Sequence, residues 1–253
     1  MNFAPATASP GENITVSGTG LTANGTIEGT AVNTGSLTGG AAILNHAANQ
    51  DISIDATGAW AYATRMPLLG AVATAGGGLT VTATDGTLTA QSSGFAYTSR
   101  TVTLTPAEAG PGTSITINVT GMTVDNGEVA GTNAQFTVSS SGIGLSGTTT
   151  FPVGSDGSGT GTSTIPTNQT AATLTITVTD NALALNPTVV ATKATQNQTA
   201  TASLKVPSGT VTVLETSAST GNFVTVTGAK FPPNTTGTTM TFGGQTLFQS
   251  VGS

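Results

Sequence analysis

Residues 101–126, TVTLTPAEAGPGTSITINVTGMTVDN, decide the fold, because the same pattern is written three times along the chain. It occurs first in residues 1–24 and last in residues 211–234. In each copy a turn containing glycine is followed by an alternating apolar–polar run, which is typical of a half-buried β-strand. The copies lie about 100 residues apart, a period that is too long for a solenoid and suits a small β domain.

Several landmarks keep their register between the copies. A second strand pattern, LTVTATD at residues 79–85, recurs as LTITVTD at residues 174–180. Each run places aliphatic residues on one face and threonines on the other, and branched threonine suits the exposed face of a strand. The closing aspartate, followed by Gly86 or Asn181, predicts a hairpin turn. The opening turns are Pro10-Gly11, Pro111-Gly112 and Thr220-Gly221, and the bulky residues that end the first run are Leu21, Met122 and Phe231.

These residues resemble the immunoglobulin-like repeats of bacterial and archaeal surface proteins, in particular the IPT/TIG-like kind. The segments that carry the resemblance are PGENITVSGTGLTANGTI (residues 10–27) and GGGLTVTATDGTLTAQSSGFAYT (residues 76–98). It covers the first two copies over nearly their full length and the front half of the third. It implies an all-β fold of tandem immunoglobulin-like β-sandwiches, which serve as spacers, adhesins and lattice subunits alike. The copies differ at two of the aligned positions. The second copy has Val119 where the first has Gly18, and the third has Lys230 where the others have Gly20 and Gly121.

The repeat divides the 253 residues into three units. We expect immunoglobulin-like domains at residues 1–100 and 101–208, and the front strands of a third domain at residues 209–253. The last strand pattern of the first unit runs directly into the second, which favours a rigid end-to-end arrangement. The third unit has about 45 residues, too few for a sandwich of about 100. We therefore expect further chain, or strand exchange with another copy, to complete it.

The low content of charged residues indicates which binding partners to expect. Charged residues make up 6% of the chain, against about 25% in an average protein. Five Lys and Arg stand against eleven Asp and Glu, so there is no basic patch for nucleic acid. A weakly charged surface has little repulsion to keep copies apart, so we expect copies of this chain to be its partners.

Further absences narrow the class of protein. The chain has no cysteine, which excludes disulfides and thiolate zinc sites. No apolar run reaches the roughly 20 residues of a transmembrane helix. The first residues, MNFAP, lack the charged and apolar regions of a signal peptide. We therefore expect either a mature piece of a longer secreted protein or a virion protein.

The residues predict no catalytic site and no cofactor. The single histidine, His46, lies in an Ala-rich stretch without the glycines of a nucleophile elbow. The eleven acidic residues are scattered singly, whereas paired-carboxylate hydrolysis needs two acids within about 10 Å of each other. Calcium is the one metal that we considered. Asp125 and Glu128 are weak candidate ligands, with Asp85 or Asp180 in support, because the several-carboxylate spacing of a calcium loop is missing.

Two features relate to carbohydrate. Trp60 is the only tryptophan, and we interpret it as a core residue, with a carbohydrate-stacking platform as the alternative. Asn-x-Ser/Thr sequons are candidate glycosylation sites. In a chain rich in Ser and Thr chance produces most of such matches, so ordinary asparagines are the favoured interpretation. The sequons begin at Asn13, Asn24, Asn118, Asn168, Asn197 and Asn234.

These observations favour a non-enzymatic structural subunit of an extracellular or cell-surface assembly. A surface layer or filament would form through contacts between copies, with strand exchange through residues 209–253. The first alternative is a phage virion protein, in a decoration or tail role. The second is an adhesin or spacer module of a secreted protein.

Overall fold

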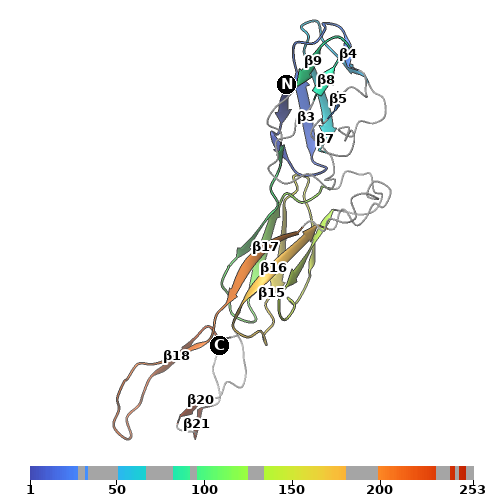
Figure 1. Cartoon of the computed structure of the whole chain (residues 1–253). Helices are drawn as coiled ribbons and strands as arrows, with labels where there is room; N and C mark the ends of the chain where they lie inside the picture. Colours follow the sequence, from blue (N-terminus) through green and yellow to red (C-terminus); the bar gives the residue numbers. More distant parts are fainter. Residues whose placement is uncertain are drawn as a thin grey trace.

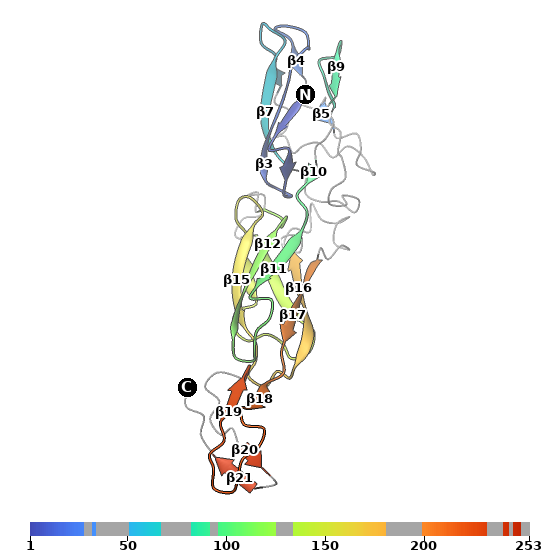
Figure 2. The same cartoon turned by 90° about the vertical axis from the view of Figure 1, so that its left-hand side faces the viewer.

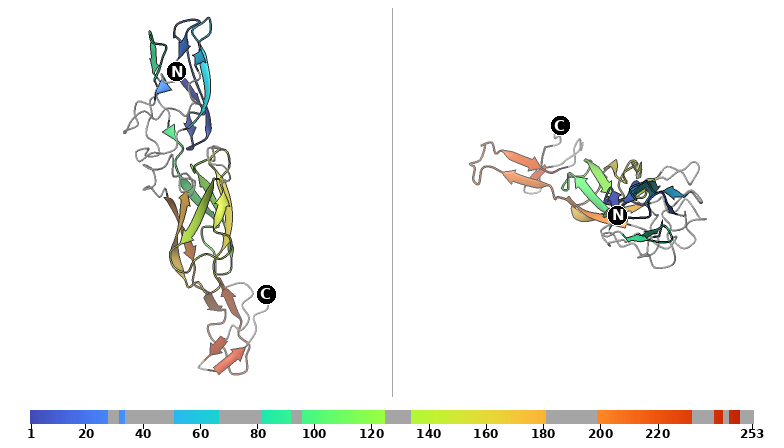
Figure 3. Two further views of the ribbon diagram at one scale, coloured as in Figure 1. Left: turned by 90° about the vertical axis from the view of Figure 1, so that its right-hand side faces the viewer. Right: turned by 90° about the horizontal axis from the view of Figure 1, so that it is seen from above.

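The computed structural model describes residues 1–27, 32–33, 51–66, 82–91, 96–124, 134–180, 199–231, 240–242 and 245–248. All regular structure in these residues is β-strand, and none of them forms a helix of the length and hydrophobicity that a membrane crossing requires. Figure 1 shows an elongated molecule, with the first domain at one end and the third unit at the other. Figure 2 and the left view of Figure 3 show the same elongated outline, and the right view of Figure 3 shows the molecule from above.

The second domain is a sandwich of two antiparallel sheets. One sheet has the order β11-β12-β15 and the other the order β14-β13-β16-β17. This strand order is the Greek-key arrangement of an immunoglobulin-like domain, so the predicted all-β immunoglobulin-like class is confirmed. The strands are β11 (Thr101–Thr105), β12 (Ser114–Thr120), β13 (Gln135–Ser140), β14 (Thr150–Pro152), β15 (Gly159–Thr164), β16 (Ala172–Asp180) and β17 (Thr199–Val206).

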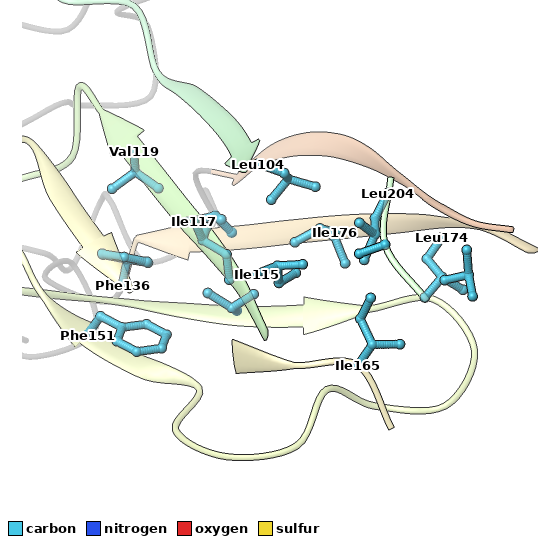
Figure 4. Packing of buried hydrophobic residues seen from close by; sticks show 14 of the residues in the cluster. Leu104, Ile115, Ile117, Val119, Phe136, Phe151, Ile165, Leu174, Ile176 and Leu204 are labelled. Atoms are coloured by element: carbon cyan, nitrogen blue, oxygen red, sulfur yellow. The ribbon is translucent and has the colours of Figure 1, made fainter. Parts of the chain in front are cut away.

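The alternating sequence builds the core of this sandwich. In β12, Ile115, Ile117 and Val119 are buried, and the residues between them are polar. β16 follows the same alternation from the facing sheet. Figure 4 shows these side chains between the sheets, beside the rings of Phe136 and Phe151, whose centroids lie 5.4 Å apart. Burial of each large aliphatic or aromatic side chain stabilises the fold by about 1.5–3 kcal/mol, which explains why these runs form strands.

Both lateral edges of the second domain are bridged between the sheets. On one side the chain after β11 continues along β17, where Ala109 N–H donates to the Lys205 carbonyl and Lys205 N–H to the Ala107 carbonyl. On the other side Ser146 and Thr164 exchange two backbone hydrogen bonds. Bridged edges limit strand addition along the sides of this domain.

The first domain repeats half of this plan closely. The sheet β1-β3-β7 has the register of β11-β12-β15, shifted by one domain. A smaller sheet, β5-β8-β9, contains the predicted hairpin at Asp85-Gly86. The counterpart at Asp180-Asn181 lies partly outside the described residues. The strands are β1 (Asn2–Ala4), β2 (Thr7–Ala8), β3 (Asn13–Gly18), β4 (Thr26–Ile27), β5 (Val32–Asn33), β6 (Ile52–Ser53), β7 (Trp60–Arg65), β8 (Thr82–Thr84), β9 (Thr89–Gln91) and β10 (Ala96–Tyr97).

One departure between the copies is a reciprocal exchange of side-chain size. Gly18 lies opposite Trp60 on β7, and a Cβ at Gly18 would lie 2.9–3.0 Å from the indole. In the second domain Val119 occupies the position of Gly18, and it lies opposite Gly159. A Cβ at Gly159 would lie 3.2 Å from Val119. Each pair thus joins one large and one small residue, which keeps the local packing volume of the two domains similar.

The third unit begins as the second domain does. β18 (Thr210–Val213) pairs with β19 (Val226–Ala229) in the register of β11 with β12, and β20 (Met240–Phe242) pairs with β21 (Gln245–Phe248). The side of this hairpin that corresponds to a core face is exposed. Val213 and Val224 are 49% and 46% exposed, whereas their counterparts Leu104 and Ile115 are 7% and 0% exposed.

Candidate functional site: the domain junctions

The part of the chain that the structure describes contains no cluster of metal ligands. No three His, Cys, Asp or Glu side chains among them lie close enough to hold a metal ion. The weak calcium candidates Asp125 and Glu128, and also His46, lie outside the described residues. The supporting candidates Asp85 and Asp180 are described, and both carboxylates accept hydrogen bonds from the protein itself.

The structure places Trp60 in the core of the first domain. Its side chain belongs to the main hydrophobic cluster there, and the residue is only 4% exposed. A sugar-stacking platform needs an exposed ring face. The burial therefore agrees with the core interpretation of Trp60 and not with the platform, because the ring faces pack inside the domain.

The sequon asparagines fall in different surroundings. Asn24 and Asn168 are exposed in turns, and Asn24 has a φ of 59°. Asn13 is exposed on β3. Asn118 is half-buried on β12, where its side-chain oxygen accepts a hydrogen bond from Thr160. Asn197 and Asn234 lie outside the described residues, and glycosylation stays a prediction.

An aspartate ties the two sequence landmarks of each domain together. In the first domain Asp85 Oδ2 accepts a 2.7 Å hydrogen bond from the N–H of Thr22. In the second domain Asp180 Oδ2 accepts from the N–H of Thr123 at 2.9 Å and from its hydroxyl at 2.7 Å. Hydrogen bonds from the N–H groups of Leu88 and then Thr22 hold the pKa of Asp85 well below its usual range. In each domain the aspartate that closes the second strand pattern is thereby fixed to the turn that follows the first strand pattern.

At the first junction, where the chain passes from the first domain to the second, Asp180 also binds the connecting segment. Arg100, the last residue before β11, donates to Asp180 at 3.0 Å. The two side chains are 12% and 0% exposed. A buried ion pair is costly to break, since either charge left alone inside the protein is poorly solvated. The pair therefore fixes the path of the chain where it leaves the first domain.

The opening turn of the first domain docks on the same end of the second. Pro10 accepts a 2.8 Å hydrogen bond from Val124 N–H, and Ser9 Oγ donates to the Asp156 carbonyl at 2.9 Å. Gly157, with a φ of 72°, lies under this contact. A Cβ at Gly157 would collide with the Ser9 side chain. The contact thus depends on backbone groups of two turns, on the Ser9 hydroxyl and on one glycine.

The second junction is built differently. Glu108 of the second domain accepts hydrogen bonds from Lys230 of the third unit at 2.8 Å and from Lys205 of its own domain at 3.0 Å. The hydrogen bonds from Lys230 and then Lys205 hold the pKa of Glu108 below its usual range. All three side chains are at least 40% exposed, so this ion pair is weaker and more sensitive to salt than the buried one.

The sequence explains the difference between the junctions. The donors Thr123 and Val124 correspond to Pro232 and Pro233 in the third copy. Proline has no N–H, so the third unit lacks both backbone donors. Lys230 stands where Gly121 stands in the second domain, and it has the same left-handed backbone, with a φ of 63° against 69°. A strained backbone at a non-glycine residue is typical of a functional position.

Sequence reasoning did not find these junction residues. It identified Lys230 as a departure and Asp85 and Asp180 as turn residues or weak calcium ligands. The available signal was the threonine that follows Leu21 and Met122 but is replaced by Pro232 after Phe231. The arrangement consists of contacts between successive domains.

No protein-family model matches the chain, and neither does any curated protein. Among solved structures, the D0–D1 domain of intimin is 16% identical, with a TM-score of 0.29, 80% of this chain covered and 93% of that chain. A tetra-tandem repeat from the extending region of a large adhesion protein is 13% identical, with a TM-score of 0.28 and coverages of 88% and 60%. Invasin, a bacterial integrin-binding protein, is 14% identical, with a TM-score of 0.27 and coverages of 82% and 40%. This chain thus spans about half of the latter two, and the fold class follows from its own strand order.

Proposed function

We propose that this chain is a non-enzymatic structural module of an extracellular or cell-surface protein, a stiff spacer built from tandem immunoglobulin-like domains of the IPT/TIG-like kind. The observation that carries the proposal is the first junction. There Val124 and Asp156 hold the turn at Ser9 and Pro10, and only residues 98–100 separate β10 of the first domain from β11 of the second. A joint of this kind keeps successive domains at a fixed angle, which is what a spacer or an adhesin stalk requires.

The outer surface of the second domain supports this proposal. Both outer sheet faces are covered by threonine and serine hydroxyl groups. These groups bind water and create only a weak electrostatic potential at the surface. A neutral surface lets many copies stand close together without mutual repulsion. On the four-stranded sheet the register aligns Thr150, Thr137, Thr179 and Thr199 in one row, and Ser139, Thr177 and Thr201 in the next.

A second candidate function is self-assembly into a surface layer or filament. The hairpin β18–β19 favours it, because Val211, Val213, Leu214 and Phe223 are 61%, 49%, 62% and 99% exposed. Exposed apolar side chains of this kind are suited to a contact with another chain. Strand exchange through residues 209–253 would cover it.

Neither function needs a cofactor. Calcium at Asp125 and Glu128 is the weaker expectation. Removing calcium with a chelator is expected to leave the thermal unfolding of the chain unchanged. A lower melting temperature in the chelator, restored by calcium, would show that the ion belongs to the structure.

Antibody labelling of intact source cells tests the proposed function. Antibodies against the second domain are expected to label intact cells, and mild protease treatment is expected to remove the signal. Electron microscopy of the labelled material then distinguishes a continuous layer or filament from isolated stalks. Label that appears only after the cells are permeabilised, or only on virions, would contradict a cell-surface role.

A further inference from the structure

The end of the first domain that faces away from the second domain repeats the surface on which the second domain receives its neighbour. Ala23 corresponds to Val124, and Thr57 and Gly58 correspond to Asp156 and Gly157. The equivalence rests on hydrogen bonds as well as on sequence. Leu21 N–H donates to the Gly58 carbonyl as Met122 N–H donates to the Gly157 carbonyl, and the threonine that follows each donates to its aspartate.

This surface, which we call the receiving surface (Ala23, Thr57 and Gly58), has its contact groups available. The N–H of Ala23 and the carbonyl of Thr57 make no hydrogen bond with the described residues, and both residues are exposed. Gly58 has a φ of 79°, close to the 72° of Gly157. The first domain therefore presents the same donor and acceptor, beside a glycine of the same backbone conformation, that hold Ser9 and Pro10 in the first junction.

The third unit carries the complementary turn, which we call the docking turn (residues 219–222). Asn222 N–H donates to the Ser219 carbonyl at 3.0 Å, as Glu12 N–H donates to the Ser9 carbonyl at 3.0 Å. Gly221 has a φ of 90°, against 80° for Gly11. Ser219 stands at the position of Ser9, whereas the second domain has Gly110 there. All residues of the docking turn are exposed.

We propose that copies of this chain associate end to end, with the docking turn of one copy on the receiving surface of the next. Ser219 Oγ then donates to the Thr57 carbonyl, and Ala23 N–H donates to the Thr220 carbonyl. This inference deepens the proposed self-assembly and rests on it. The occupant is a second copy, because this chain holds both halves of a contact that it already uses once internally.

The geometry has consequences for the assembly. The two surfaces are different and lie on different units, so the contact is heterologous and does not close on itself unless the rotation happens to form a ring. Repetition therefore gives a linear filament. Within the chain the first junction benefits from covalent linkage, which supplies an effective concentration in the mM range. Between copies the same few bonds predict weak association, with a Kd of roughly 0.1–1 mM in solution.

A pair of blocking variants tests the proposal on the full chain. Ser219→Trp obstructs the docking turn, and Ala23→Trp obstructs the receiving surface. Ala23→Pro is a second variant of the receiving surface, which removes the N–H donor without the bulk of an indole. Thr175→Trp, on the exposed outer face of β16, is the matched control for added bulk. Sedimentation from about 10 µM to about 1 mM measures association across the expected range of affinity. Circular dichroism verifies that each variant folds.

The wild-type chain and Thr175→Trp are expected to associate equally. Each blocking variant alone is expected to lose association at least tenfold. Equal mixing of the Ser219→Trp and Ala23→Trp chains is expected to restore association only as far as dimers, because each chain keeps one intact surface.

Three results would overturn the inference: a wild-type chain that stays monomeric to about 1 mM, blocking variants that still associate, or a mixture that forms no dimer. Loss of association in Thr175→Trp alone would indicate contacts along the sides, and association insensitive to all three positions would point to the apolar hairpin β18–β19. Those last two results contradict the end-to-end contact while they leave self-assembly itself intact. Labelling of intact cells tests the surface role independently.

Discussion

Two cross-strand pairs show how the domains share one plan with different side chains. The first domain has Gly18 opposite Trp60, and the second domain has Val119 opposite Gly159. The sequence identified Val119 as a departure from Gly18. It did not identify the compensation, because the partner lies about 40 residues further along the chain and only the strand register brings the two together. Departures between repeats are therefore best interpreted in pairs across strands.

Gly18→Val is expected to destabilise the first domain by about 1–3 kcal/mol, because the new side chain overlaps the indole of Trp60. Urea unfolding followed by circular dichroism measures the change. Gly144→Val is the matched control, since a Cβ at Gly144 meets nothing within 4 Å, and it is expected to be nearly neutral.

The same pair allows a double-mutant test. Trp60→Ala alone is expected to cost about 3–5 kcal/mol. In the double variant the valine fills part of the space left by the indole, so the two losses are expected to be less than additive by at least about 0.5 kcal/mol. Strictly additive losses would contradict the proposed size exchange.

Asp85 gives a prediction about pH. Its pKa is held below the usual range in the folded chain, chiefly by the Leu88 N–H and then by Thr22. A depressed folded pKa contributes stability above the unfolded pKa of about 3.9, and the contribution disappears as the pH falls through the folded value. Asp85→Asn is therefore expected to lower the melting temperature at pH 7 and to flatten its dependence on pH below about 4. An unchanged acid profile in this variant would contradict the assignment.

At the scale of strands and turns, the sequence predicted most of what forms. The alternating runs became β3, β12 and β16, and the turn at Asp85-Gly86 joins β8 to β9. What it did not predict are the links between elements. Both aspartates were interpreted locally, as turn residues, whereas their carboxylates bond threonines at distant turns. Local patterns carry no information about such long-range pairs.

The hairpin β18–β19 provides a prediction at this scale. Its exposed apolar side is expected to bind a hydrophobic dye such as ANS. Val213→Thr with Val224→Thr keeps the branched side chains that favour strands and is expected to reduce dye binding at least twofold. Thr103→Val, on the outer face of β11, is the reverse control and should raise dye binding only slightly. Equal dye binding in the double variant and the wild type would show that other residues bind the dye.

The ion pair between Glu108 and Lys230 gives the second prediction about an element. Because the chain lacks cysteine, spin labels at Ser203→Cys and Thr212→Cys report a single distance across the second junction. Lys230→Gly removes the cation and relieves a left-handed backbone that costs a non-glycine residue about 1–2 kcal/mol. It is expected to broaden the distance distribution without lowering stability.

High salt and Glu108→Gln are expected to broaden that distribution in the same way, because both weaken the ion pair. Lys205→Ala is the control, since Lys205 lies in the same domain as Glu108 and does not cross the junction. A distribution that stays narrow in Lys230→Gly would show that other contacts hold the third unit in place.

At the scale of the whole molecule, the direct passage from the first domain to the second predicted a rigid arrangement. The residues that make it rigid could not be predicted, because the turn at Ser9 and the loop at Val124 lie more than 100 residues apart and belong to different domains. The two prolines of the third copy were the visible sign that the second junction differs. The molecule thus combines one buried joint with one exposed joint.

The most direct test of the account is the relative orientation of the first two domains in solution, measured by residual dipolar couplings. We predict that amides of both domains fit a single alignment tensor, with the orientation of Figure 1. The fit is expected to hold in high salt, since the joint rests on Arg100, Asp180 and backbone hydrogen bonds. Two tensors of different magnitude would show that the domains reorient independently, and they would contradict the stiff spacer.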